Sequence, residues 1–313
     1  MVGKYGPIIP KWTANSENSS QFSEWSMMPS RVSTRLMMPC SPKIARQTMI
    51  RDDAMPASVM WKELTAEELR AKAAAGAIVV LPVASMEQHG PHLPVGVDTI
   101  LCEGVCRAGA EQAANDVPVV VAPTLWCGMA EHHMAFGGTF TFDVPTYRAV
   151  LLAFLRSLER HGFSRVLIVN GHGGNIAALN AFLPDFARET RLRVSAATYF
   201  ELMRTDIAPL LEDQTTVQHA CEVETSLMMV IAPDLVRRER MREAFSDPDA
   251  RSRFRTVPAR FRSFKEITAS GVLGDARRAS RAKGEKLLET LAGGLADLLR
   301  SGKLDGPTTA PEK

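Results

Sequence analysis

Apolar and polar residues alternate along this chain on two length scales. Short runs of apolar and small residues, of the length of a strand, lie at residues 77–83, 117–123, 165–170 and 192–198. Longer stretches with helical spacing of apolar residues lie at residues 98–114, 145–161, 176–190, 222–231 and 283–300. Strands that alternate with helices predict an α/β fold, in which helices cover both faces of a mainly parallel sheet.

Local signals refine the ends of these elements. Thr65 followed by Glu68 is a capping-box pattern, which predicts a short helix that ends near Gly76. Gly162 ends the helix over residues 145–161. A short strand is expected at Thr139–Phe142.

The pattern predicts a single domain over residues 55–300, without internal repeats. Residues 1–54 are rich in Ser, Pro, Met and Arg and show no sustained periodicity, so we expect a disordered extension. Their bias weakly resembles an organelle transit peptide, but they contain no apolar stretch of a secretory signal. Residues 301–313 are short and polar and are predicted to be a flexible tail.

Composition narrows the class of protein. The 313 residues carry a formal net charge of +2, with no basic segment of the kind that binds nucleic acid. No run of 18 apolar residues is present, so a membrane span is not expected. The five cysteines include no CxxC pair, and free thiols in a cytoplasmic protein are the expectation.

Candidate chemistry follows the first predicted strand. Glu87, His89, His92 and Asp98 combine imidazole and carboxylate, which suits Zn²⁺, Mn²⁺ or Fe²⁺. Glu87 and His89 are two residues apart, so in an extended segment their side chains point the same way. The alternative is a polar loop in which Asp98 caps the next helix.

Three further segments carry histidine or paired carboxylates. A glycine-rich turn, residues 170–175, follows the third strand and contains His172; it lacks the spacing of a nucleotide-binding loop. His219 precedes Glu222 and Glu224, which lie where a helix dipole also favours carboxylates. His132 and His133 form the last pair. In parallel sheets, ligands bind beyond the carboxyl ends of the strands, where the loops that carry His89 and His172 both start.

These segments together resemble the creatininase family. The resemblance rests on the run from Leu81 to Pro94 (LPVASMEQHGPHLP), the Asn-Gly-His-Gly-Gly-Asn turn, His219–Ser226, and Gly271–Asp275 with Ala282–Glu285. It covers roughly residues 60 to 300, with the motifs in the family's order. It implies a three-layer α/β/α sandwich, usually a homohexamer, with two divalent metal ions per chain, Zn or Mn.

The resemblance also implies roles for individual residues. The metal ligands would be Glu87, His89, Asp98 and His172, with Asp98 bridging the two ions. His219 would transfer a proton, and Glu222 is a second candidate for that role. Substrate contacts are expected from His133, Asn175 and Phe200.

Four positions depart from creatininase itself. Gly174 occupies the position of a ligating Glu, so the missing carboxylate is expected from Glu224, with Glu222 as the alternative. Phe200 and Thr215 fall near the places of the creatinine-binding tryptophans, which argues against creatinine as the substrate. Gly137 replaces a Pro and is expected to loosen the loop there.

The implied reaction is hydrolysis of a C–N bond in a small, possibly cyclic, amide by a hydroxide held between the two metals. Relatives that cleave a formamide, a peptide or a keto sugar leave the substrate open. The chain is expected to bind a small molecule, and neither nucleic acid nor membrane. A non-catalytic binding protein on the same fold, or a one-metal sugar-processing enzyme, is the alternative of another class.

Overall fold

The computed structural model describes residues 58–254 and 258–305. Its centre is a parallel sheet with the strand order β2-β1-β3-β4, formed by β1 (Ile78–Val83), β2 (Val119–Val121), β3 (Arg165–Asn170) and β4 (Arg193–Thr198). Ile78 of β1 lies opposite Val119 of β2 and Arg165 of β3. All four strands were predicted from the pattern, and the expected parallel sheet is confirmed.

Alternating side chains of the central strand fill two separate cores. Every residue of β1 is buried. Val80 belongs to one core with Leu101 and Leu291, whereas Val79 belongs to the other with Tyr147. Successive residues of a strand point to opposite faces, so a continuous apolar run can be buried only when both faces are covered.

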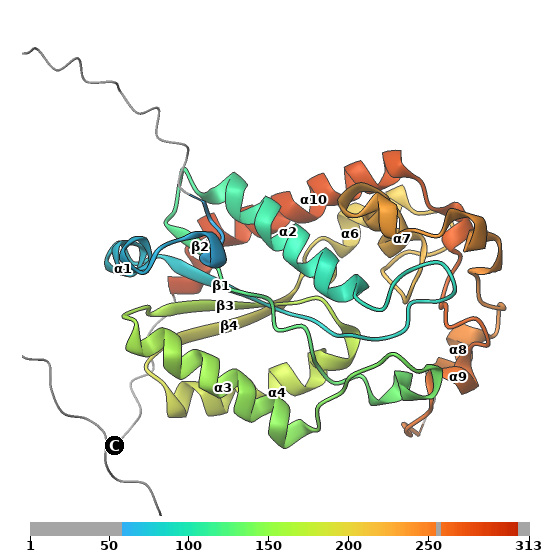
Figure 1. Cartoon of the computed structure of the whole chain (residues 1–313), viewed down its shortest axis with the longest axis horizontal. Helices are drawn as coiled ribbons and strands as arrows, with labels where there is room; N and C mark the ends of the chain where they lie inside the picture. The colour runs from blue at the N-terminus through green and yellow to red at the C-terminus, as the bar shows by residue number, and fades with distance from the viewer. Residues whose placement is uncertain (1–57, 255–257, 306–313) are drawn as a thin grey trace, which may run out of the picture. The chain divides into compact units, whose positions relative to one another are not determined.

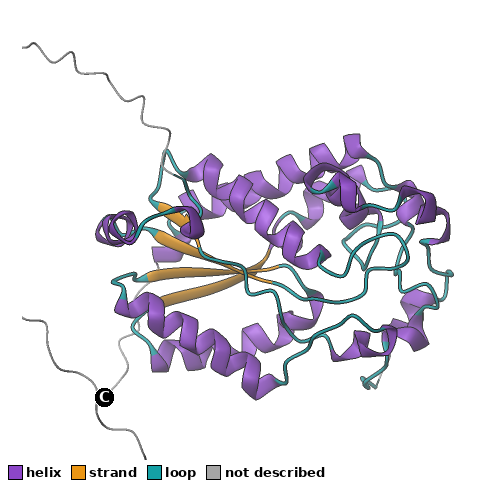
Figure 2. Ribbon diagram, viewed as in Figure 1, coloured by secondary structure: helices purple, strands orange, loops and turns teal. Residues whose placement is uncertain are grey.

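Helices form a layer on each face of the sheet, as Figures 1 and 2 show. One layer contains α2 (Val97–Ala113), α7 (Glu222–Ile231) and α10 (Arg281–Arg300). The other contains α3 (Val144–Arg160) and α4 (Ile176–Glu189). The fold is therefore the three-layer α/β/α sandwich that the resemblance implied.

Shorter helices lie at the two ends of the sheet. The first, α1 (Ala66–Ala74), begins at the predicted capping box of Thr65 and Glu68. At the opposite end in Figure 1 lie the segments that surround the candidate site, α5 (Tyr199–Leu202), α6 (Arg204–Ile207), α8 (Ala250–Phe254) and α9 (Phe264–Ile267).

The connections create a crevice between β1 and β3. After β1 the chain enters α2 on one face, whereas after β3 it enters α4 on the other face. Loops that leave neighbouring strands toward opposite faces form the crevice in which parallel sheets bind ligands. The two candidate histidine loops start at these strand ends.

Two expectations about local structure are wrong. Thr139–Phe142 forms no strand: Phe140 and Thr141 each make one isolated bridge, to Met86 and Gly128, instead of joining the sheet. The tail is ordered over residues 301–305, because Leu304 is buried in a 3-10 turn over Lys303–Asp305. Residues 1–54, with Cys40, and 306–313 lie outside the described residues, so their predictions stay untested.

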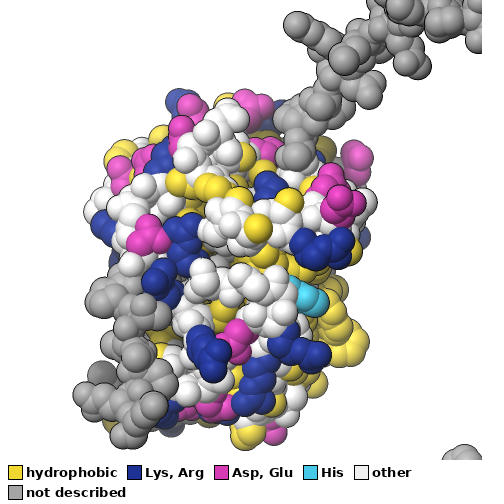
Figure 3. Space-filling view, turned by 90° about the vertical axis from the view of Figure 1, so that its left-hand side faces the viewer, with side chains coloured by type: hydrophobic (Ala, Val, Ile, Leu, Met, Phe, Trp, Pro, Cys, Tyr) yellow, Lys and Arg dark blue, Asp and Glu magenta, His cyan; other side chains and the backbone are white. Residues whose placement is uncertain are grey.

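The described cysteines are Cys102, Cys106, Cys127 and Cys221, and all four are buried and free, as expected. None of the helices in the described part of the chain is long and apolar enough to cross a membrane. On the end of the molecule that carries α1, basic and acidic side chains are interspersed (Figure 3).

Candidate metal centre

Five predicted ligands converge at the carboxyl edge of the sheet. Glu87 and His89 lie in the loop after β1, and His172 lies in the turn after β3. Asp98 and Glu224 lie in the first turns of α2 and α7, so two helices on one face supply carboxylates to the same crevice. Asp98 is not a helix cap, because Gly96 occupies that position.

The Asp98 carboxylate lies between two groups of ligand atoms. One oxygen, Oδ1, lies 3.1 Å from His89 Nε2, which is also 3.9 Å from Glu224 Oε2. The other, Oδ2, lies 3.0 Å from His172 Nδ1, which is also 3.3 Å from Glu87 Oε2. Each group could hold one cation, and Asp98 is the ligand that both share.

The outward nitrogen of each histidine faces a backbone carbonyl. His89 Nδ1 lies 3.0 Å from Glu87 O, His172 Nε2 lies 3.2 Å from Met129 O, and His219 Nε2 lies 2.7 Å from Gln88 O. A carbonyl can only accept, so in each neutral ring the outward nitrogen donates its proton. The inward nitrogen then offers a lone pair, which is the arrangement of metal-binding histidines.

Two buried carboxylate oxygens without hydrogen-bond partners indicate that the residues of this cluster fit a metal. Glu87 Oε1 and Asp98 Oδ2 are buried and accept no hydrogen bond, although histidine nitrogens surround them at 3.0–3.5 Å. A buried carboxylate oxygen without a partner is costly. Divalent cations would satisfy both oxygens, and the mixed donor set suits Zn or Mn, so the residues fit.

Protons occupy this cluster when no metal is bound. Burial opposes the charged form of His89, but Asp98, Glu224 and Glu87 outweigh it and raise its pKa to about 9. The pKa of His172 is raised for the same reasons. Burial raises the pKa of Glu224 to about 7, against the opposing effect of His89. The metal-free cluster therefore holds protons that a cation must displace.

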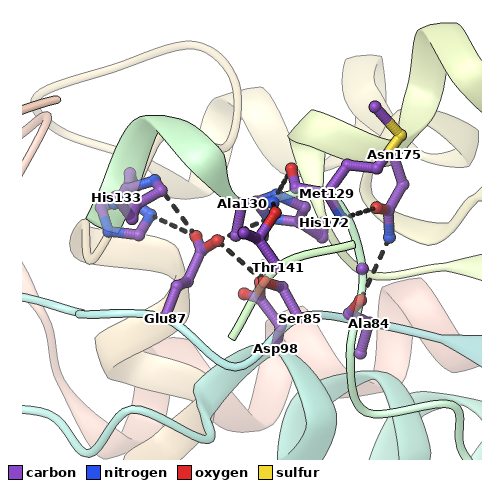
Figure 4. A network of polar contacts seen from close by, with 12 residues as sticks. Ala84, Ser85, Glu87, Asp98, Met129, Ala130, His133, Thr141, His172 and Asn175 are labelled. Atoms are coloured by element: carbon purple, nitrogen blue, oxygen red, sulfur yellow. Dashed lines mark hydrogen bonds and ion pairs between the residues drawn. The ribbon is translucent and has the colours of Figure 1, made fainter. Parts of the chain in front are cut away.

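Gln88 organises two further histidines beside the cluster. Its amide nitrogen lies 2.9 Å from His133 Nδ1 and 3.0 Å from Gly271 O, so its two hydrogens have two acceptors. His133 Nδ1 is then the acceptor, and His133 Nε2, which carries the hydrogen, lies 3.3 Å from Glu87 Oε1 without bonding to it. Figure 4 shows the Glu87 carboxylate between His133 and His172.

His219 lies in a strained segment next to Glu87. Its Nδ1 is 3.5 Å from Glu87 Oε1. Burial, with the positive charge of His89, holds the pKa of His219 well below its usual range. The next residue, Ala220, has φ of 51°, a conformation that residues other than glycine rarely adopt, and its N–H donates to Glu224.

Glu222 does not fit the catalytic or metal-binding role expected of it. Its carboxylate is fully buried away from the cluster and pairs with Lys283. It also accepts hydrogen bonds from the backbone of Glu212 and Asp213 at 3.1–3.2 Å. Glu222 and Glu224 are two residues apart on a helix, so they face different directions. Glu222 is a structural residue that joins α7, α10 and the preceding loop.

Asn175 also differs from its expected role in substrate binding. The side chain is fully buried and holds loops together: Oδ1 accepts from Met129 N at 2.9 Å, and Nδ2 donates to Ala84 O at 3.1 Å. These contacts occupy the amide, and Asn175 does not line the cavity over the cluster. His92 lies outside the cluster too, bonded through Nε2 to Thr225 Oγ1 at 2.7 Å.

A cavity of about 480 Å³ lies over the cluster. His133, His219 and Phe200 line it, as expected for residues that contact a substrate. The lining also includes residues that the sequence did not single out, namely Arg204, Arg260, Arg262, Phe254, Phe261 and Phe264. These residues lie in short helices and loops without a motif, so only the fold brings them to the site.

The turn after β3 has no room for a side chain at residue 174. A Cβ on Gly174 would lie 2.4 Å from both His172 Nε2 and Met129 O. Gly137, in contrast, has φ of 81° and no neighbour near its Cβ position. The carboxylate that creatininase is expected to place at residue 174 therefore has no space here, and Glu224 supplies a second carboxylate beside His89, in addition to Asp98.

The sandwich and the buried histidine and carboxylate cluster define an α/β protein with a candidate binuclear metal centre. A family model described as "Creatininase: Creatinine amidohydrolase" matches residues 62–299. The chain belongs to the creatininase family of hydrolases.

Curated relatives cover several activities. The chain is 32% identical to creatinine amidohydrolase from Pseudomonas putida, over 79% of this chain and 98% of that protein. It is 31% identical to the mycofactocin precursor peptide peptidase of Mycolicibacterium smegmatis, over 71% and 84%. It is 27% identical to a 3-dehydro-scyllo-inosose hydrolase from Thermotoga maritima, over 59% and 60%.

Solved structures support the fold and the kind of site. A crystal structure of creatinine amidohydrolase matches with a TM-score of 0.67 and 29% identity, over 80% of this chain and all of that one. Two further creatininase structures, described as "Zn-Zn type" and "Creatininase Mn", match with TM-scores of 0.65 and 0.64. Each is 29% identical, over 79% or 78% of this chain and 98% of the other.

Proposed function

We propose that this protein is a metal-dependent amidohydrolase that cleaves a C–N bond of a small amide. The observation that supports this most directly is the pair of ligand groups that share Asp98, each with histidine lone pairs aimed inward. Glu87, Asp98 and His172 would hold one divalent ion, and His89, Asp98 and Glu224 the other.

The metals, Zn or Mn, would polarise the amide carbonyl and lower the pKa of water so that it attacks at neutral pH. The chain's own residues would handle orientation and protons. His219, whose Nδ1 lies 3.5 Å from Glu87 Oε1, would accept a proton from the attacking water and pass it to the departing nitrogen. His133 Nε2–H, which is fixed by Gln88, would donate to the substrate carbonyl or to the product carboxylate.

Creatinine is not the substrate we favour. Phe200 lines the cavity, and no tryptophan does so among the described residues. The relatives act on creatinine, a peptide and a keto sugar, so the same centre serves different leaving groups. Hydrolysis of a keto sugar or of a formamide is the second candidate, because the cavity leaves room for either.

Metal content and chelator sensitivity test the proposal. Purified protein reloaded with Zn²⁺ or Mn²⁺ is expected to hold two ions per chain and to hydrolyse at least one of a panel of cyclic amides, formamides and short peptides. A chelator should abolish that activity. Loading without hydrolysis of any panel member would favour a non-catalytic binding protein, whereas one ion per chain would exclude the two-metal centre.

Asp98→Ala is the sharpest variant, since it removes the ligand that both groups share. We expect it to lose most of the bound metal and all detectable hydrolysis. Asp297→Ala is the matched control, because its side chain is 80% exposed and far from the cavity lining. Two bound ions in Asp98→Ala, measured by elemental analysis, would contradict the assignment.

A further inference from the structure

The cavity over the metal centre carries an excess of positive charge toward its opening. Three of its four acids, Glu87, Asp98 and Glu224, are at most 5% exposed and belong to the metal cluster, and the fourth, Glu201, is exposed and pairs with Arg204. Its arginines Arg204, Arg260 and Arg262 are exposed or half-buried. Two divalent ions would offset the buried carboxylates, so the arginines would dominate the field that an incoming molecule meets.

Two of these arginines have no acid partner in the described part of the chain. Arg260 and Arg262 form no salt bridge with any described residue, whereas Arg204 lies 3.6 Å from the exposed carboxylate of Glu201. Arg262 Nε is buried and makes no hydrogen bond. A buried guanidinium N–H without an acceptor is costly, and a ligand oxygen would remove that cost.

Apolar rings lie beside these cations in the same cavity. Phe261 is 69% exposed and Phe254 is 45% exposed, while Phe264 is buried beneath them against His133 and His219. Exposed aromatic side chains that line a cavity mark a surface that binds an apolar group. The lining therefore combines cations with aromatic rings.

We propose that the substrate carries an oxyanion, a carboxylate or a phosphate, attached through an apolar portion to the bond that is cleaved. Arg262 and Arg260 would bind the oxyanion, and Phe254 and Phe261 would cover the apolar portion. Guanidinium groups suit both oxyanions because they donate two parallel hydrogen bonds. The inference rests on the proposed function only for the bond that is cleaved; the binding of the anion does not depend on turnover.

Binding of three probes to the Zn-loaded protein tests the inference. Phenylacetate, phenyl phosphate and phenylacetamide share the ring and differ in the group that the arginines would bind. We expect one or both anions to bind at least about tenfold more tightly than phenylacetamide in calorimetric titrations. The preferred anion then separates a carboxylate substrate from a phosphate substrate.

Arginine variants distinguish the proposed site from anion binding at the metals. In the double variant Arg260→Gln/Arg262→Gln the preference for the anions over phenylacetamide should fall to about twofold or less. The control variant Arg242→Gln changes an exposed arginine outside the cavity and should keep the preference. A preference that survives in the double variant would place the anion on the metals and overturn the inference. So would equal binding of all three probes.

Metal analysis of the same samples keeps this test separate from that of the proposed function. Two ions per chain with no arginine-dependent preference would overturn the anion site alone. An arginine-dependent preference in a chain that holds no metal would overturn the hydrolase and leave the anion site standing.

Discussion

Single hydrogen bonds set the chemistry of the candidate centre at the scale of the residue. His89, His172 and His219 each face a backbone carbonyl with their outward nitrogen, so in the neutral form all three rings direct a lone pair toward the carboxylates, where a metal would bind. His133 differs from these three histidines. The Gln88 side chain donates to its Nδ1, so the ring carries its proton on Nε2. One glutamine therefore decides whether His133 presents a donor or a lone pair to the cavity.

Gln88→Met tests this positioning role. Without the amide, His133 is free to change tautomer, and we expect kcat to fall by about 10- to 100-fold while two metals stay bound. Ring nitrogen chemical shifts of His133 should show the change directly, which a loss of stability alone would not produce. Gln112→Met, on the exposed side of α2, is the control. An unchanged tautomer in Gln88→Met would exclude the role.

Neighbouring glycines offer a matched pair in the turn after β3. Gly174→Ala would place a Cβ 2.4 Å from the Met129 carbonyl, so the carbonyl must move and release His172. We expect a loss of about 2 kcal/mol in the free energy of unfolding and weaker metal binding. Gly173→Ala meets nothing within 4 Å and should stay within about 0.5 kcal/mol of the parent chain. Equal effects in urea unfolding would contradict the assigned crowding.

At the scale of the element, the buried pair of Glu222 and Lys283 joins α7 to the start of α10. Glu222 is fully buried and the Lys283 side chain is 11% exposed, so removing Lys283 leaves the Glu222 charge with only the backbone N–H groups of Glu212 and Asp213. The Ser226 hydroxyl adds a second link, since it accepts from Ser280 N at 3.1 Å. These contacts hold α7, and with it Glu224, in place.

Lys283→Met is expected to lower the free energy of unfolding by about 3 kcal/mol, because it leaves the Glu222 charge buried. The double variant with Glu222→Gln should recover part of that loss. Glu222→Gln alone should keep both metals and its activity, measured on folded protein. Lys286→Met, exposed on α10, is the control. Loss of hydrolysis in a stable Glu222→Gln chain would restore the catalytic role for Glu222.

The spacing of residues in the sequence predicted where the strands and helices lie. It predicted less well the directions in which their side chains point. Apolar runs placed all four strands, and loops at the strand ends located the crevice correctly. Glu222 and Glu224 look equivalent in the sequence, but helical geometry allows only one to face the cluster, and packing against α10 determines which. Asn175 belongs to the motif yet bonds only to backbone and to Asn170, which no spacing rule predicts.

At the scale of the whole molecule, the site depends on segments far apart in the sequence. The ligands span residues 87 to 224, and the cavity wall adds Phe254 and residues from 260 to 267, which lack any motif. Such contacts follow from the closed fold, so the sequence could indicate the metal cluster but not the arginines over it. The expected homohexamer, the cytoplasmic location and the ligand roles stay predictions.

Buried His92 makes the free energy of unfolding of the whole domain depend on pH. It lies in the loop after β1 and bonds to Thr225 of α7, with Nδ1 buried and unpaired. Burial, with the nearby positive charge of His89, lowers the pKa of His92 to about 4, from 6.5. Between these values the unfolded chain takes up the proton and the folded chain does not. Stability is therefore full above about pH 6.5 and falls as the pH decreases toward 4.

His92 is expected to contribute about 3 kcal/mol to the loss across that range, and His92→Gln should remove that share. Urea unfolding of metal-free protein at several pH values would measure the slope, so that acid release of metal does not contribute. His161→Gln is the matched control, since His161 is exposed at the end of α3 and should leave the slope unchanged. If His92→Gln kept the parent slope, the assignment to His92 would be wrong, and the acid sensitivity would arise at another buried histidine such as His219.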